Sequence, residues 1–188
     1  STNIPYYKLK SLNGTSYYVY ITNDGRLKVN TSEPTLGTEG TTITITTVDS
    51  TTPTVPVGTR VTDNNGNVFV YAQGVTGIDA THNWVSFDAD YVTTLLAANA
   101  VGRVGIAMGV IDATTKYGWF QIYGKNAIAG TDAVAINKNV YIDATAGRVD
   151  DAAVTGDIIL GAWTRSTDAS TNIATVELNY PFVTDILG

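Results

Sequence analysis

Cysteine is absent from this chain of 188 residues, and its absence excludes several classes of protein at once. Disulfide scaffolds, thiolate catalysis, iron–sulfur clusters and cysteine-ligated zinc all require it. Charge is scarce as well, with 15% charged residues and a formal net charge of −6. The eleven lysines and arginines are scattered singly, so they form no basic stripe for a phosphate backbone. We therefore expect no nucleic-acid partner.

The chain also lacks an apolar run of the roughly 20 residues that a membrane helix needs. Its first residues, Ser1-Thr2-Asn3-Ile4-Pro5, do not show the charged-then-apolar order of a secretion signal. We therefore expect no membrane partner and synthesis in the cytoplasm. The small first residue fits an N-terminus from which methionine has been removed.

Leucine and glutamate, two common helix formers, number only 9 and 3. By contrast, the chain holds 30 Thr, 20 Val and 15 Ile, so β-branched residues make up 65 of the 188. Such side chains lose rotamer freedom in a helix and pack well on a pleated sheet. The composition predicts an all-β fold: a small β-barrel or β-sandwich with an N-terminal hairpin or arm and at most one or two short helices.

The turn signals divide the chain after residue 57. Within residues 1–57, two strand-like runs flank Asn23-Asp24-Gly25, which predicts a hairpin over residues 15–30. The stretch 31–57 is rich in Thr and holds three prolines, which indicates an extended arm with one strand at 42–46. Residues 58–188 are expected to form the β-barrel or β-sandwich domain.

Strand signals are closely spaced from Gly58 onward. A tight turn at Asn64-Asn65-Gly66-Asn67 predicts a second hairpin. A helix capped by Asp90 is predicted over residues 91–100. Further strands are expected at residues 84–87, 103–108, 118–123, 139–142, 158–163 and 173–178.

Residue patterns for catalysis are weak. The single histidine, His82, could act as a general base only beside a nucleophile, and the chain has no Gly-x-Ser-x-Gly elbow. Three glutamates alone give little support for glycoside hydrolysis by paired carboxylates. Residues 102–109 are rich in glycine without a phosphate-binding spacing, so we interpret these glycines as bends or close strand contacts. We expect a protein that is not an enzyme and uses no cofactor.

Three aspartates, Asp79, Asp88 and Asp90, cluster in the sequence with Asn83. Carboxylate and amide oxygens are the ligands that calcium prefers. Their spacing does not match an EF-hand loop, so we interpret them as carboxylates of solvated loops. We expect no metal centre, with an incidental calcium site as the alternative.

Aromatic residues are the most informative group, with eleven Tyr and three Trp. Strand alternation over residues 117–123 places Tyr117, Trp119 and Tyr123 on one face and two further apolar residues on the other. A small domain alone in water does not need two apolar faces on one strand. We take Tyr117, Trp119 and Tyr123 as the candidate interface with another chain, with burial inside the same chain as the alternative.

A family resemblance is carried by five segments of the second half of the chain, namely Val104-Gly105-Ile106-Ala107, residues 117–124, residues 146–151, Ile159-Leu160-Gly161 and Leu178-Asn179-Tyr180-Pro181. In this order, over residues 55–183, they resemble small virion proteins of tailed phages, the capsid decoration or cement proteins. The N-terminal segment lies outside the resemblance.

The resemblance implies a non-enzymatic protein that decorates and stabilises the outer surface of a bacteriophage capsid by bridging major capsid protein subunits. It also implies a homotrimer. The expected partners are the major capsid protein and further copies of the chain, and the expected location is the virion, after synthesis in the cytoplasm of the host bacterium. The alternative is a phage fibre-associated receptor-binding module or a carbohydrate-binding β module, in which exposed Trp and Tyr stack on sugar rings.

Overall fold

The chain divides into two compact units, residues 1–44 and residues 45–188, which we call the N-terminal unit and the body. The computed structural model describes residues 6–10, 15–21, 27–30, 44–80, 82–168 and 171–184. The division falls earlier than the boundary expected after residue 57. Residues 45–57 belong to the body because their side chains pack on it, as shown below.

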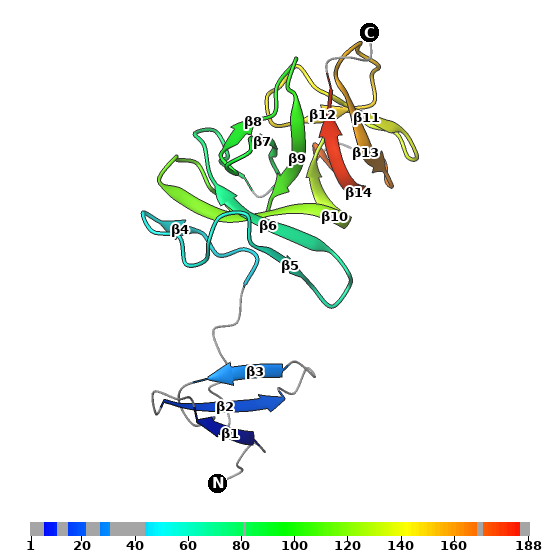
Figure 1. Ribbon diagram of the computed structural model, residues 1–188. Helices are drawn as coiled ribbons and strands as arrows, with labels where there is room; N and C mark the ends of the chain where they lie inside the picture. The colour runs from blue at the N-terminus through cyan, green and yellow to red at the C-terminus, as the bar shows by residue number, and fades with distance from the viewer. Residues whose placement is uncertain are drawn as a thin grey trace. The chain divides into compact units, whose positions relative to one another are not determined.

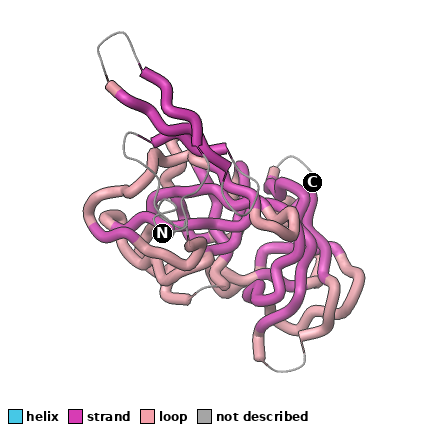
Figure 2. Tube along the Cα trace, turned by 90° about the horizontal axis from the view of Figure 1, so that it is seen from below, coloured by secondary structure: helices cyan, strands magenta, loops and turns pink. Residues whose placement is uncertain are grey.

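Every element in the described part of the chain is a β-strand (Figures 1 and 2), which confirms the all-β fold. A closed barrel is not found there, and no described helix is long and apolar enough to cross a membrane. The strands are β1 (Tyr6–Lys10), β2 (Ser16–Ile21), β3 (Leu27–Asn30), β4 (Asp49–Ser50), β5 (Arg60–Thr62), β6 (Val68–Gln73), β7 (Trp84–Phe87), β8 (Thr93–Leu95), β9 (Gly102–Ala107), β10 (Lys116–Gly130), β11 (Asn139–Ile142), β12 (Val149–Asp150), β13 (Ile158–Thr164) and β14 (Ile173–Val183).

The N-terminal unit is a three-stranded antiparallel sheet in the order β1-β2-β3. Strands β2 and β3 confirm the hairpin predicted over residues 15–30, in which Val19 pairs with Val29. Strand β1 was not predicted, because two lysines interrupt its short apolar run. The turn at Asn23-Asp24-Gly25 lies outside the described residues.

The body is organised around the long strand β10. Its first half pairs with β6 and its second half with β14, while β9 pairs with both β10 and β14. Strands β13, β11 and β12 extend the sheet beyond β14, and β7 and β8 extend it beyond β9. Because β10 serves two sets of neighbours, its side chains contribute to more than one part of the core.

Three clusters of buried side chains form the core of the body. The largest includes Trp84 and draws on β7, β9, β11, β13 and β14. The second lies on one face of β6 and β10, where Phe120 meets Phe87 edge to face with ring centroids 5.4 Å apart. The third lies on the opposite face of the same two strands and is built around Tyr71 and Trp119. Both faces of β10 are thus buried over residues 118–122, within the stretch whose alternating apolar pattern was noted in the sequence.

The glycines of residues 102–109 allow close packing. A Cβ atom on Gly105 would lie 2.8 Å from Cε2 of Phe87, and one on Gly109 would lie 2.6 Å from Cγ2 of Val48. Real Cβ atoms do not approach so closely. This confirms for these two glycines the interpretation that they permit close contacts rather than phosphate binding.

The helix predicted over residues 91–100 is wrong. Residues 93–95 form β8, which pairs with β7, and Oγ1 of Thr93 donates a hydrogen bond of 2.7 Å to the carbonyl of Gln73. Tyr91 and Asn99 have φ angles of 60° and 63°, in the left-handed region that a right-handed helix cannot contain. Two adjacent threonines favour the strand through their β-branched side chains.

The strand predicted over residues 42–46 is also not present in its described part. Ile45 and Thr46 lie in a turn, and the only strand pairing of the described part of this segment is that of β4 with Lys116 and Tyr117 of β10. The alternating Thr and Ile pattern is therefore used differently, because Ile45 packs against the cluster around Trp119.

The predicted second hairpin is confirmed as β5 and β6. Its turn is closed by Asp63, whose Oδ1 accepts hydrogen bonds from the backbone N–H groups of Asn65 and Asn67 at 2.8 and 2.9 Å. Gly66 follows with a φ of 81°, in the left-handed region that glycine adopts without strain.

We expect Gly66→Val to destabilise the body by about 1 kcal/mol or more, because a β-branched residue resists the positive φ of this turn. No atom lies within 4 Å of a Cβ built on Gly66, so the cost is conformational rather than steric crowding. The test is urea denaturation of the wild type and the variant. Gly66→Asn is the matched control and should be nearly neutral, because asparagine tolerates this region; equal losses from both variants would contradict the explanation.

Asp49 holds residues 45–57 against β6. Its Oδ2 accepts hydrogen bonds from the hydroxyl of Tyr71 and from the backbone N–H and hydroxyl of Thr54, the last two at 3.1 and 2.7 Å. Burial works to raise the pKa of Asp49, but these hydrogen bonds outweigh it and the pKa lies below its usual value. Burial, followed by the bond to Asp49, raises the pKa of Tyr71 to about 12.

The stability of the body is therefore expected to fall at alkaline pH through Tyr71. A tyrosine in the unfolded chain has a pKa of about 10, so the folded state holds this proton more tightly. The stabilisation is complete below pH 10 and is lost as pH rises through about 12. Urea midpoints of Tyr71→Phe should decline less between these pH values than those of the wild type, while the exposed Tyr7→Phe should follow the wild type. Identical pH profiles for Tyr71→Phe and wild type would contradict this.

Candidate binding surfaces

Two of the three candidate interface residues lie inside the body. Trp119 is only 3% exposed and meets Tyr71 edge to face, with ring centroids 5.1 Å apart. Tyr117 is half-buried and stacks on Tyr71 at 6.4 Å. Ile45 and Val55, from the segment 45–57, cover this cluster. The alternative of burial within the same chain therefore applies to Tyr117 and Trp119.

Tyr123 is separated from them by an irregular stretch of β10. Two fully buried amides fix this stretch: Nε2 of Gln121 donates to the carbonyls of Tyr123 and Lys125, both at 3.1 Å, and Nδ2 of Asn126 donates to Oε1 of Gln121 at 2.9 Å. Gly124 has a φ of 92°. The strand bends here, and Tyr123 remains 38% exposed.

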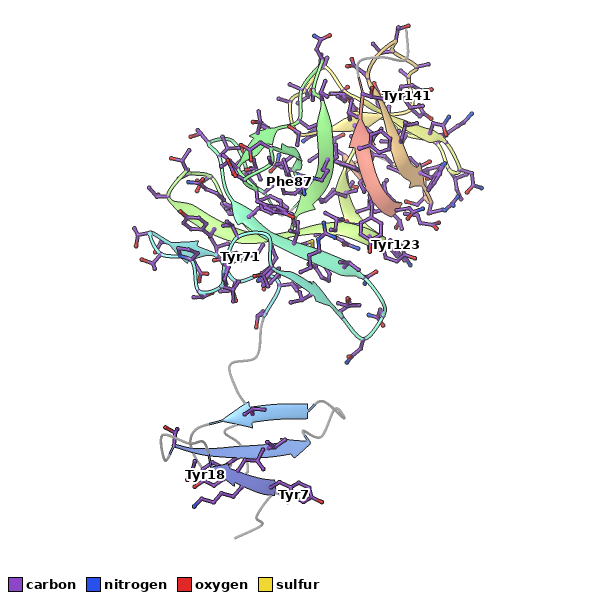
Figure 3. All side chains as sticks on the ribbon, in the orientation of Figure 1. Tyr7, Tyr18, Tyr71, Phe87, Tyr123 and Tyr141 are labelled. Carbon is purple, nitrogen blue, oxygen red and sulfur yellow. The ribbon has the colours of Figure 1, made fainter. Side chains whose placement is uncertain are left out.

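Tyr123 borders an open hollow of about 580 Å³ over β10, β13 and β14, which we call the β14 face. Figure 3 labels Tyr123 beside β10 and β14. The strand register brings its residues together, since Glu177 lies opposite both Trp163 and Lys125, and Asn179 lies opposite Tyr123. The hollow is lined by Tyr123, Gly124, Lys125, Trp163, Arg165, Glu177, Leu178 and Asn179.

A second exposed ring extends the β14 face. Tyr180 is 50% exposed, and its ring centroid lies 5.2 Å from that of Tyr123 at an interplanar angle of 34°. Tyr180 has a φ of 48°, and this irregularity lets two successive residues of β14, Asn179 and Tyr180, both remain exposed. Regular alternation would have buried one of them.

An ion pair lies on the opposite side of the hollow. Nε of Arg165 donates to Oε2 of Glu177 at 2.7 Å, and Nη1 of Arg165 donates to Oδ1 of Asn137 at 3.1 Å. The two bonds hold the planar guanidinium in one orientation. Glu177 is the one carboxylate among the described lining residues, so the face offers no carboxylate pair for acid–base chemistry. Its mixture of rings and planar polar groups is suited to binding.

The N-terminal sheet presents a second exposed surface. Pairing of Tyr7 with Val19 and of Val19 with Val29 places these three residues in one row across the strands, and Leu9 lies on the same face as Tyr7. Tyr7, Leu9 and Val29 are 80%, 56% and 62% exposed. We call this the apolar face of the N-terminal sheet.

Lys8 and Tyr18 lie on the opposite face of that sheet. Nζ of Lys8 lies 5.3 Å from the ring centroid of Tyr18, across the β1–β2 pair (Figure 3 labels Tyr7 and Tyr18). Lys8 is exposed on this face, whereas the exposed apolar side chains of the sheet, Tyr7, Leu9 and Val29, lie on the other. The two units also differ in charge: residues 1–44 hold four Lys and Arg against three Asp and Glu, and residues 45–188 hold seven against fourteen.

His82 lies half-buried in the turn before β7, where its carbonyl accepts a hydrogen bond of 3.0 Å from the backbone N–H of Gly130. Burial and the charge of Arg148 lower the pKa of His82, against an opposing effect of Asp79. Among the described residues, no nucleophilic side chain forms a hydrogen bond with its imidazole ring. The imidazole ring also packs against Gly130, since a Cβ built on that glycine would lie 3.0 Å from Cδ2 of His82.

We expect His82→Ala to leave the binding of the protein to its partners unchanged. The hydrogen bond from the N–H of Gly130 to the turn is retained, because the carbonyl of residue 82 is still present. The measurement is the binding of the purified variant to those partners, compared with that of the wild type, with circular dichroism as the check on folding. Loss of binding by a folded His82→Ala protein would give this residue a function that its surroundings do not indicate.

Two side chains of the Asp and Asn cluster near His82, those of Asp88 and Asn83, close local turns. Oδ1 of Asp88 accepts hydrogen bonds from the backbone N–H groups of Asp90 and Val92 at 2.9 and 2.8 Å, and Oδ1 of Asn83 accepts one from Ala80 at 2.9 Å. These are local loop-closing bonds. In the described part of the chain, no group of three or more His, Asp or Glu side chains is placed to hold a metal ion.

The described residues form an all-β protein of two units, and each unit has exposed apolar or aromatic side chains. No protein-family model matches the chain, no curated protein matches it, and no solved structure matches it. The family resemblance of residues 55–183 therefore rests on its sequence segments alone.

Several residues of the β14 face were not found from the sequence. Trp163 and Glu177 lie in strands that were predicted, but nothing in a single strand shows which neighbour lies opposite. Lys125 lies within β10 but beyond the strand predicted over residues 118–123, and Arg165 follows the last residue of β13, so alternation in the predicted strands gives no guidance for either. One sequence signal for the β14 face was available, because the polar segment Gly124-Lys125-Asn126 follows an aromatic run. This segment marks the point at which β10 stops being buried on both faces.

Proposed function

We propose that this protein is a non-enzymatic virion protein of a tailed phage, which decorates and stabilises the outer surface of the capsid by bridging major capsid protein subunits. The observation that carries the proposal is the exposed apolar face of the N-terminal sheet. The likeness of residues 55–183 to decoration proteins supports the same conclusion.

The size of the N-terminal unit supports a docking role. A unit of 44 residues buries too little apolar surface to be stable by its core alone, and units near this size rely on disulfides, metals or association. The chain has no cysteine. A partner that covers Tyr7, Leu9 and Val29 would supply the missing burial, and an assembled capsid offers such a partner in many copies.

Charge supports one orientation on that partner. Acidic residues outnumber basic ones two to one in the body, whereas the N-terminal unit has a slight basic excess. The acidic body remains well solvated, and the N-terminal unit faces the shell. The major capsid protein is accordingly the proposed partner, and the outer capsid surface is the proposed location.

The proposal includes a homotrimer, because decoration proteins of this kind often form one. Trp119 does not take part in it, since it is covered by the same chain. Light scattering should give a mass of three chains of 19.9 kDa each. The mass of one chain at every concentration would remove the trimer from the proposal.

The second candidate function is a phage fibre-associated or carbohydrate-binding module, and the β14 face favours it, with two exposed tyrosines beside an open hollow lined by both aromatic and polar side chains. Cryo-electron microscopy of the parent virion separates the two functions. Density for this chain on the outer capsid surface would support decoration, and density at the tail tip would support the second candidate.

A further inference from the structure

We propose that the β14 face binds a saccharide that carries a carboxylate, such as a glucuronic acid residue of a surface polysaccharide. The site is formed by Tyr123, Tyr180, Lys125, Arg165, Glu177 and Asn179. It lies wholly within the body and does not depend on where the protein sits on the virion. It would give a decoration protein a second, outward activity.

The rings supply the apolar part of recognition. A sugar ring has faces of C–H groups that pack on an aromatic ring, and such contacts need exposed, fixed rings. Tyr123 and Tyr180 are 38% and 50% exposed and lie 5.2 Å apart. The buried amides of Gln121 and Asn126 fix the backbone around Tyr123, and the contact with Tyr180 limits the orientations of its ring before a ligand binds.

The polar groups of the site supply the directional part of recognition, the hydrogen bonds to the sugar. The guanidinium of Arg165 is already oriented by Glu177 and Asn137, which leaves its remaining N–H groups as donors. The bond from Arg165 uses Oε2 of Glu177, so Oε1 can accept from a sugar hydroxyl. Asn179, opposite Tyr123, offers a donor and an acceptor in one plane. Paired donors and acceptors match the adjacent hydroxyls of a pyranose.

The charge of the site selects an acidic sugar. Lys125 is exposed between Tyr123 and the ion pair, and no carboxylate pairs with it among the described residues. Glu177, the nearest acid in the register, is bonded to Arg165. The hollow thus has one uncompensated positive charge in a body with twice as many acidic as basic residues. A ligand carboxylate can pair with this ammonium group.

The test is an NMR titration of the full chain with oligosaccharides containing glucuronic acid and, in a parallel arm, with their neutral glucose counterparts. We expect the acidic sugars to bind about tenfold more tightly than the neutral ones. Tyr123→Ala should weaken both by about tenfold or more, because stacking is lost for either sugar. Lys125→Met should remove the preference for acidic sugars, because the ammonium group that pairs with the ligand carboxylate is lost.

Lys138→Met is the matched control, since Lys138 is exposed just before β11 and does not line the hollow. It should bind both sugars as the wild type does. The proposal is overturned if neither sugar binds at about 10 mM, if Tyr123→Ala binds as well as the wild type, or if Lys125→Met keeps the preference. Both key side chains are exposed, so these variants should fold, and their circular dichroism spectra verify it.

Discussion

Trp84→Ala is expected to lower the free energy of unfolding of the body more than any other substitution proposed for it, by about 3–5 kcal/mol. Trp84 is fully buried in the largest core cluster, and its Nε1 donates a hydrogen bond of 3.0 Å to the carbonyl of Gly130. Removing a buried tryptophan costs about 3–5 kcal/mol through lost burial and the cavity left behind. A domain of this size has a free energy of unfolding of about 5–15 kcal/mol. The carbonyl of Gly130 would also lose this partner, which adds to the cost.

Urea denaturation followed by far-ultraviolet circular dichroism measures this loss. Trp163→Ala removes the same atoms from a half-exposed site on the β14 face and should cost about 1 kcal/mol. Trp84→Phe keeps most of the side-chain volume but not the N–H group. Its loss of stability should therefore lie between those of Trp84→Ala and Trp163→Ala. If Trp84→Ala and Trp163→Ala lose equal stability, Trp84 does not have the central place in the core that its burial indicates.

The strands were the most predictable part of the fold, because two local signals agree in them. In residues 68–73, β-branched and aromatic residues follow a turn with Gly66, and in residues 139–142 apolar residues occupy alternate positions. Such patterns depend only on neighbours in the sequence. The prediction of a helix over residues 91–100 was wrong because Tyr91 and Asn99 take left-handed conformations, which no local sequence pattern indicates.

Long-range contacts were the least predictable part. Residues 45–57 contain prolines and many threonines, which resemble a linker, and yet Ile45 and Val55 cover Trp119. Alternation correctly showed that both faces of β10 are apolar. It could not show whether the same chain or another chain covers them, since a period of two residues carries no information about the covering atoms. For Trp119, the sequence therefore left two alternatives open: an interface with another chain, and burial within the same chain.

The β14 face depends on deviations from regular structure, and these are hard to read from sequence. The bend of β10 at Gly124 and the left-handed Tyr180 in β14 together expose two tyrosines that a regular sheet would have placed differently. Bends and bulges of this kind re-aim side chains. They arise from the pairing of two distant strands, so the sequence of either strand alone does not predict them.

Replacing Tyr7, Leu9 and Val29 together with serine is expected to abolish attachment to the capsid. All three residues are more than half exposed, so they contribute little to the fold of the sheet itself. On the capsid, under the proposed function, each would be covered and would contribute on the order of 1–2 kcal/mol. The triple variant should therefore bind on the order of 1,000-fold more weakly. Cosedimentation of the purified chain with undecorated capsids measures this affinity.

Lys8→Ser is the matched control, because Lys8 lies in the same strand as Tyr7 and Leu9 but on the opposite face, over the ring of Tyr18. Its effect should not exceed about threefold, since an exposed cation contributes little to such an interface. Light scattering of the triple variant reveals which partner the apolar face serves. If the variant loses self-association but still coats capsids, the face joins copies of this chain and the body must contact the shell. If the triple variant and Lys8→Ser bind capsids equally well, the apolar face has no part in docking.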